Sequence, residues 1–267
     1  MALPRFFVSN ENATGYLEGH EVEVRADSAT LHHAYRVLRI RPGERIEIVS
    51  RDVWDAYEAK VIALSDDHLI VSVLKHLSVR GSRIPFDLIW GWAKQGKNDV
   101  IVRQATEIGC ERLIPVIFDR CVVKAKGASG IKRMERLNTI IESAAAQSHR
   151  WSIPTLEPIQ TFGEMIGTLE TYDAVIVAWE EKSEPMLSQV VDEVLQGEPE
   201  RIALVIGPEG GIERDEIDTL VEHGALLASM GPSILRVETA CIAGCAVLAD
   251  RIQTVQGHED LSQDTGL

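Results

Sequence analysis

The sequence is poor in cysteine and has no long hydrophobic run. Four cysteines in 267 residues exclude a disulfide-stabilised scaffold and favour a reducing compartment. The longest uncharged apolar stretch, residues 239–249, is well short of the ~20 residues that span a bilayer, so we expect no membrane helix. The first fifteen residues have no apolar segment ahead of a cleavage site. We therefore expect a cytoplasmic protein.

Positive charge is also scarce, with 27 Lys and Arg against 41 Asp and Glu and a net charge of −14. Taken alone, this acidity argues against a nucleic-acid partner, because phosphates repel an acidic protein. The charge is uneven, however: residues 76–150 hold 13 basic against 7 acidic residues, and residues 151–267 hold 5 against 22. A local basic patch of this kind is used by nucleic-acid-binding proteins, whereas a solvated surface is the alternative.

Residues 1–80 form the first predicted domain, a small β-barrel. Strands are expected at 5–8, 21–25, 45–49, 56–64 and 69–77, and one amphipathic helix at 28–39. The pattern breaks at Arg80-Gly81-Ser82-Arg83. We place the domain boundary there.

Residues 81–267 form the second predicted domain, in which strands and helices alternate. Strands are expected at 86–90, 113–118, 174–179, 202–206 and 226–230, and helices at 98–108, 132–150, 184–195, 213–223 and 237–253. This rhythm predicts an α/β fold with a mainly parallel sheet and helices on both faces. The polar tail, 257–267, is expected to fray.

A glycine-rich turn, Gly207-Pro208-Glu209-Gly210-Gly211, follows the apolar strand at 202–206. Open α/β sheets bind ligands at such strand ends, and glycine lets the backbone approach a ligand closely. The turn matches neither the P-loop nor the GxGxxG motif, so a plain tight turn is the alternative. The segments 178–180 and 229–240 also follow strands, and we expect all three to converge into an apolar slot.

Two motifs invite a metal-site interpretation, His32-His33 and Cys241-x-x-x-Cys245. The cysteines lie on an apolar helix, where buried free cysteine is common, and no second ligand pair is close in sequence. We expect no metal.

Five segments together resemble the ribosomal RNA small-subunit methyltransferase E family. They are HHAYRVLRIRPGE at 32–44, KQGKNDVIVRQATEIG at 94–109, AAQSHRWSIP at 145–154, GPEGG at 207–211 and ILRVETA at 234–240. The resemblance implies a PUA-like RNA-binding barrel and a SPOUT methyltransferase domain with a trefoil knot, usually in a homodimer. It also implies S-adenosylmethionine-dependent methylation of N3 of a uridine in 16S rRNA of the small ribosomal subunit.

The resemblance also assigns site residues. Those implied for the cofactor are Trp179, Glu180, Gly207, Pro208, Glu209, Gly210, Gly211, Met230, Gly231, Ile234, Leu235 and Arg236. Arg236 is expected to stabilise the uracil anion, and Glu238 to orient Arg236 or to accept the proton. The alternatives are that Glu209 only closes its turn and that Arg236 and Glu238 form a structural ion pair.

Basic residues of both domains are expected to contact RNA phosphates. They are Arg5, Arg36, Arg39, Arg41, Lys94, Lys97, Arg120, Lys124 and Arg150. Trp151 is expected either to stack on an unpaired base or to pack in the core. Two other functions stay open: a non-catalytic RNA-binding assembly factor, and a SPOUT enzyme that modifies another RNA position. Intact cofactor segments favour the enzyme.

Overall fold

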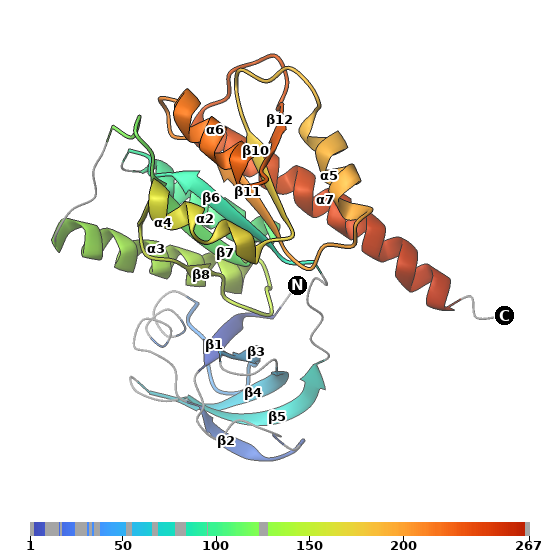
Figure 1. Cartoon of the computed structure of the whole chain (residues 1–267). Helices are drawn as coiled ribbons and strands as arrows, with labels where there is room; N and C mark the ends of the chain where they lie inside the picture. Colours follow the sequence, from blue (N-terminus) through green and yellow to red (C-terminus); the bar gives the residue numbers. More distant parts are fainter. Residues whose placement is uncertain are drawn as a thin grey trace. The chain divides into compact units, whose positions relative to one another are not determined.

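The structure, a computed structural model, is shown in Figure 1. It describes residues 3–8, 16, 18–24, 31, 34, 38–51, 55–65, 69–77, 84–94, 96–122 and 128–264. The chain divides into two compact units. The first contains Met1–Gly81 and Glu142–Ile153, and the second contains Ser82–Ile141 and Pro154–Leu267.

The first unit is built on a five-stranded sheet of order β1-β3-β4-β5-β2. Its strands are β1 (Arg5–Val8), β2 (Glu21–Val24), β3 (Arg45–Ser50), β4 (Ala56–Leu64) and β5 (Leu69–Leu77), so all five predicted strands are confirmed. The pair β1–β3 is parallel and the other pairs are antiparallel. The sheet curls into a half-barrel, as expected for a PUA-like domain (Figure 1). The predicted helix at 28–39 falls mostly outside the described residues.

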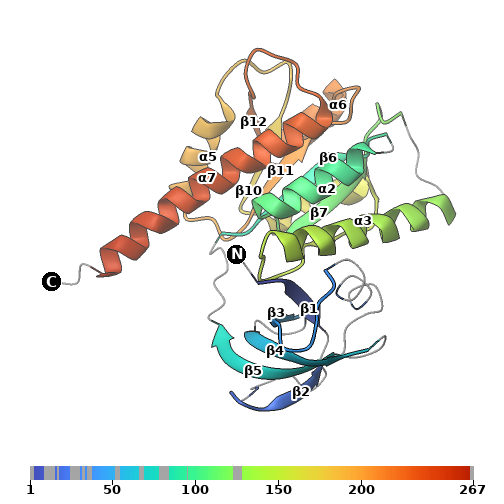
Figure 2. The same ribbon diagram turned by 180° about the vertical axis from the view of Figure 1, so that it is seen from behind.

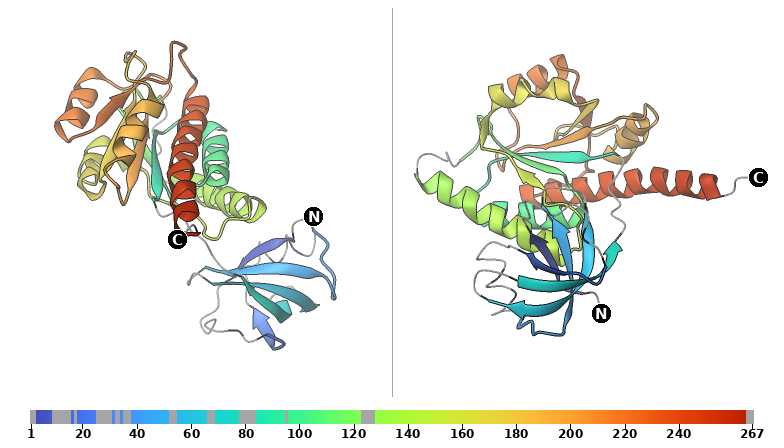
Figure 3. Two further views of the ribbon diagram at one scale, coloured as in Figure 1. Left: turned by 90° about the vertical axis from the view of Figure 1, so that its right-hand side faces the viewer. Right: turned by 90° about the horizontal axis from the view of Figure 1, so that it is seen from below.

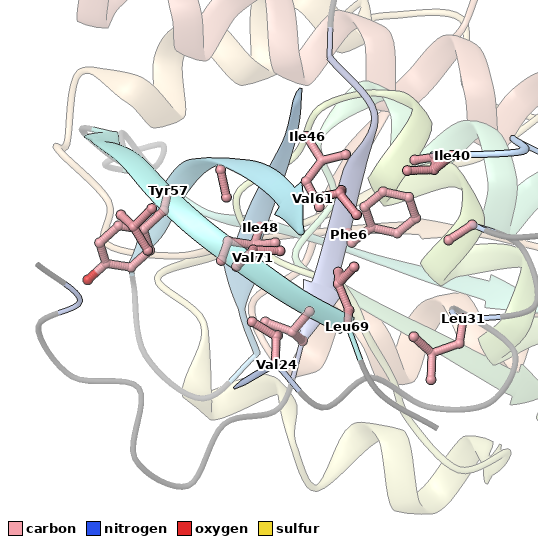
Figure 4. Close-up of a cluster of buried hydrophobic side chains, with 14 residues drawn as sticks. Phe6, Val24, Leu31, Ile40, Ile46, Ile48, Tyr57, Val61, Leu69 and Val71 are labelled. Carbon is pink, nitrogen blue, oxygen red and sulfur yellow. The ribbon is translucent and has the colours of Figure 1, made fainter. Parts of the chain in front are cut away.

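The inner face of the curled sheet carries the core of this unit. Alternate residues of β3 point inward, and Ile46 and Ile48 are almost completely buried. Figure 4 shows them packed with Phe6 from β1, Val61 from β4 and Val71 from β5. The period-two pattern that predicted the strands is therefore the pattern of burial.

The second unit is built on a seven-stranded sheet of order β12-β10-β11-β6-β7-β8, with β9 also paired to β7. Every pairing in this sheet is parallel. Its strands are β6 (Phe86–Gly91), β7 (Arg112–Ile117), β8 (Thr155–Leu156), β9 (Gln160–Thr161), β10 (Ala174–Ala178), β11 (Ile202–Ile206) and β12 (Leu226–Ala228). The central strands β6 and β11 are buried throughout, as expected for a sheet covered on both faces.

Helices cover both faces of this sheet. They are α2 (Lys97–Ile108), α3 (Ala128–Gln147), α4 (Phe162–Ile166), α5 (Leu187–Leu195), α6 (Arg214–Glu222) and α7 (Val237–Asp264), with the short 3₁₀ helix η2 (Leu169–Thr171). Helices α2 and α7 pack together on one face, while α4 and α6 lie on the other (Figures 2 and 3). The predicted α/β layers are confirmed. The prediction that residues 257–267 fray is wrong as far as Asp264, because α7 continues to that residue.

The amino end of the sheet is closed by an ion-pair cluster. Asp87, fully buried near the start of β6, accepts hydrogen bonds from Arg112 Nε at 2.8 Å and from Arg201 Nε at 3.0 Å. These two arginines neutralise a carboxylate that would otherwise be costly to bury. At the carboxyl end, the loops that follow the strands surround a cavity.

The four cysteines are free and buried. Cys110 Sγ lies 3.4 Å from Cys245 Sγ. Within the described ranges, no three His, Cys, Asp or Glu residues are grouped so that they could hold a metal ion. In the same ranges no helix has the length and apolar character to cross a membrane.

Candidate active site

A cavity of about 500 Å³ opens at the carboxyl ends of β10, β11 and β12. Three loops that follow these strands form most of its wall, and the first turn of α2 adds Lys97. All twelve residues predicted to bind the cofactor line it: Trp179, Glu180, Gly207, Pro208, Glu209, Gly210, Gly211, Met230, Gly231, Ile234, Leu235 and Arg236. The expected convergence of three strand ends is therefore what the structure contains.

The glycine turn 207–211 packs so closely on its neighbours that side chains would not fit. A Cβ atom on Gly211, whose φ is +76°, would lie 2.0 Å from Glu180 Oε1. A Cβ atom on Gly91, at the end of β6, would lie 2.3 Å from the backbone nitrogen of Pro208. The turn thus packs backbone against backbone on the end of β6, and on the side chain of Glu180 after β10.

Arg120 holds the same turn from outside the cavity. Its Nη1 donates to the carbonyl oxygen of Gly210 at 3.2 Å. Its Nε lies 2.7 Å from Glu213 Oε1, and its Nη2 donates to Glu213 Oε2 at 2.7 Å. The hydrogen bond from Arg120 lowers the pKa of Glu213, so this fork-shaped pair is charged at neutral pH. Arg120 was predicted to bind RNA, but its guanidinium is occupied with the turn.

Glu209 points from the glycine turn toward α2. Its Oε1 accepts a hydrogen bond from Lys94 N at 3.2 Å and lies 3.3 Å from Lys97 Nζ. Burial acts to raise the pKa of Glu209, but the hydrogen bonds from Lys94 and Lys97 outweigh it and the net shift is downward. Glu209 is therefore ionised at neutral pH. Besides closing its turn, it ties that turn to α2.

Arg236 and Glu238 do not contact each other. Arg236 lines the cavity and is exposed, and its guanidinium makes no hydrogen bond or ion pair with the described residues. Glu238 is not among the lining residues, and its Oε2 lies 3.2 Å from Lys97 Nζ. The alternative in which Arg236 and Glu238 form an ion pair is therefore wrong, as is the expectation that Glu238 orients Arg236.

The remaining wall combines apolar surface with unused donors. Met230 and Leu235 come from the segment after β12, where Ile234 is 88% exposed. The Nε1 atom of Trp179 is buried and has no partner among the described residues. Buried polar atoms are normally hydrogen-bonded, so this indole indicates an absent ligand or a water.

The residues predicted to contact RNA differ in their exposure and in their partners. Arg36 and Lys124 lie outside the described residues. Arg39, Arg41 and Lys94 are exposed, and their contact with RNA stays a prediction. Arg150 donates to Ser152 Oγ at 3.5 Å. Lys97 lines the cavity rather than the outer surface.

Arg5 is not a phosphate-binding residue in this structure. Its side chain is 3% exposed. Its Nε and Nη2 donate to Glu47 Oε2 at 2.8 and 2.6 Å, and its Nη1 donates to Arg150 O at 2.9 Å. The guanidinium lies 4.0 Å from the ring centroid of Trp151. Arg5 therefore holds the segment after α3 within the first unit, and Trp151 packs in its core rather than offering a free face to a base.

Replacing Arg5 with methionine is expected to reduce stability by about 3–5 kcal/mol, because Glu47 loses its main partner in a buried site. Urea unfolding followed by circular dichroism measures this. Arg45→Met is the matched control: Arg45 also pairs with a glutamate, Glu58, but its side chain is 59% exposed, and ~0–1 kcal/mol is expected. Equal losses in the two variants would contradict the structural role of Arg5.

The sequence did not predict that Lys97 lines the cavity and forms ion pairs with Glu209 and Glu238. Its position beside other basic residues suggested a surface patch, and no pattern in the sequence links it to Glu209 or Glu238. The only available signal was the KQGKND segment, which the resemblance singled out as a whole.

Comparisons with known proteins agree with this geometry. Residues 80–249 match a family model described as an RNA methyltransferase domain, and residues 27–74 match one described as an RNA methyltransferase PUA domain. The chain is 31% identical to ribosomal RNA small subunit methyltransferase E of Mycobacterium bovis, over 78% of this chain and 79% of that one. It is 28% identical to the Bacillus subtilis protein of the same name, over 86% and 90%.

One similar solved structure contains a bound ligand. Ribosomal RNA small subunit methyltransferase E from Neisseria gonorrhoeae, bound to S-adenosylmethionine, superposes with a TM-score of 0.78. The two share 25% sequence identity over 93% of this chain and 98% of that one.

Proposed function

Because the chain belongs to the ribosomal RNA small subunit methyltransferase E family, we propose that it methylates 16S ribosomal RNA with S-adenosylmethionine, at N3 of a uridine. The observation that carries this proposal is the cavity at the carboxyl edge of the parallel sheet. It is lined by the glycine turn, by the segment from Met230 to Arg236 and by Lys97. Ligands of open α/β sheets bind at this edge.

The residues of the cavity fit S-adenosylmethionine. Its adenine suits the apolar wall formed by Met230 and Leu235, and Trp179 Nε1 is a buried donor without a partner. The carboxylates of Glu180 and Glu209 suit its positive sulfonium. Gly207 and Gly211 line the cavity without side chains, so their backbone faces it.

When bound, S-adenosylmethionine supplies an electrophilic methyl group. Uridine N3 carries a proton and is a weak nucleophile until that proton leaves. Arg236 donates hydrogen bonds to a uracil oxygen and so stabilises the negative charge that develops as N3 loses its proton to water. The N3 electron pair then forms the bond to the methyl carbon as the carbon–sulfur bond breaks, and its electrons remain on sulfur.

We place the reaction in the cytoplasm, on the small ribosomal subunit. The exposed Arg39, Arg41 and Lys94 are the described residues that we assign to phosphate contacts. The net charge of −14 opposes binding to bare RNA, so a folded, protein-bearing particle is the better substrate. Homodimer formation and the trefoil knot are proposed from the family resemblance.

Calorimetric titration with S-adenosylmethionine tests the enzyme against a binding module of the same fold. The enzyme is expected to bind one cofactor per chain in the micromolar range, about −8 kcal/mol. No detectable heat, with a folded protein and a working positive control, would refute the methyltransferase assignment.

A further inference from the structure

One ammonium group joins three segments of the chain at the edge of the cavity. Lys97 Nζ, in the first turn of α2, lies 3.3 Å from Glu209 Oε1 in the glycine turn and 3.2 Å from Glu238 Oε2 in the first turn of α7. The side chains of the three residues are between 20% and 28% exposed. Ion pairs shielded from solvent to this degree are stronger than those on an open surface.

Among the described residues, Lys97 is the ion-pair partner of Glu238. Its Oε2 is buried and makes no hydrogen bond among the described residues. At 3.2 Å, Lys97 Nζ neutralises its charge without the alignment of a hydrogen bond. Since Glu238 is absent from the cavity lining, its carboxylate is badly placed to take a proton from a bound uracil. It is well placed to act on Lys97.

Lys97, in contrast, lines the cavity. An ammonium has three N–H donors, and the two carboxylates can engage at most two of them. One donor is left for a ligand. A long, flexible lysine normally loses rotamer entropy when it binds, and the two glutamates have already restricted it.

The charges select the acceptor for this last donor. Two carboxylates already surround the ammonium, so a further carboxylate, such as that of the cofactor's amino-acid end, would be repelled. A neutral carbonyl oxygen that gains negative charge only during the reaction avoids this repulsion. A uracil oxygen beside N3 has this property.

We propose that Lys97 is a catalytic residue that donates to a uracil oxygen as N3 loses its proton, and that Glu238 is a positioning residue that acts through Lys97. The proposal rests on the proposed function. Arg236, directly before α7, and Lys97, in the first turn of α2, then both approach the uracil. In this account Glu238 is not the proton acceptor.

The test is a set of variants assayed for methyl transfer to small ribosomal subunits, with cofactor affinity measured separately by calorimetry. Lys97→Met is expected to lower kcat by about 10²-fold and leave the cofactor Kd within about threefold of wild type. Glu238→Gln, which keeps the shape and removes the charge, is expected to lower kcat about tenfold. Lys97→Arg is expected to recover part of the activity that Lys97→Met loses.

The double variant decides whether the two residues act together. If Glu238 acts through Lys97, adding Glu238→Gln to Lys97→Met costs nothing more. Glu193→Gln, an exposed glutamate on α5, is the matched control and should leave both constants and the melting temperature unchanged.

Three results would overturn the inference alone while wild type transfers methyl groups. They are independent, multiplicative losses in the double variant, a larger loss from Glu238→Gln than from Lys97→Met, and a raised cofactor Kd with normal kcat for Lys97→Met. The last would assign Lys97 to the cofactor. Absence of transfer by wild type would overturn the proposed function as well.

Discussion

Replacing Arg236 with alanine is expected to lower the rate of methyl transfer at saturating cofactor by about 10²- to 10³-fold, the usual effect of removing a donor that stabilises a developing anion. Arg236 lines the cavity, and its guanidinium has no hydrogen bond or ion pair among the described residues, so its removal breaks no such bond there. The cofactor Kd should stay within about threefold of wild type. Transfer of a radiolabelled methyl group to small subunits measures the rate, and calorimetry measures the affinity.

Two further variants bracket this result. Arg236→Lys keeps the charge but loses the planar fork, and an intermediate rate is expected. Arg251→Ala removes a half-buried arginine of α7, which pairs with Asp192 at 3.4 Å and does not line the cavity, and should have no effect on the rate. Turnover unchanged in Arg236→Ala would remove this residue from the catalytic machinery.

Replacing Gly91 with alanine is expected to lower both the rate of methyl transfer and the cofactor affinity, although Gly91 does not line the cavity. The added Cβ would lie 2.3 Å from the backbone nitrogen of Pro208 and 2.7 Å from its Cα, so the glycine turn must move. Displacements of about 1 Å in a catalytic site cost on the order of 10²-fold in rate. We expect a loss of at least that size and a weakened cofactor affinity.

Gly163→Ala is the matched control for Gly91→Ala. Gly163 lies in α4, and a Cβ atom there would meet nothing within 4 Å. Affinity and rate should match wild type, with a slight gain in stability. A Gly91→Ala protein that binds the cofactor normally would contradict the tight backbone contact between β6 and the glycine turn.

Much of the fold could be predicted because burial repeats with the period of each element. Alternation in β3 and continuous apolar runs in β6 and β11 fixed these strands to within a residue or two. The cavity followed from topology, since parallel strands place their carboxyl ends on one edge. The elements β8, β9, α4 and η2 were missed because segments of two to five residues are too short for a periodic signal.

What could not be predicted depends on contacts between residues far apart in the chain. Arg5 stands in an apolar strand, and only its neighbours at Glu47 and Trp151 show that it is structural. Lys97 and Glu238 are 141 positions apart, and their ion pair depends on α2 packing against α7. Local patterns locate the loops that form a site, but the partners of each charge are set by packing.

The central claim is that this chain methylates N3 of a uridine in 16S ribosomal RNA. Its most direct test is mass spectrometry of 16S nucleosides from a strain that lacks the protein, with a strain complemented by the wild-type gene and one complemented by Arg236→Ala. We expect 3-methyluridine to disappear in the deletion strain, to return with the wild-type copy and to stay low with the Arg236→Ala copy. Persistence of 3-methyluridine at its normal level in the deletion strain would contradict the claim.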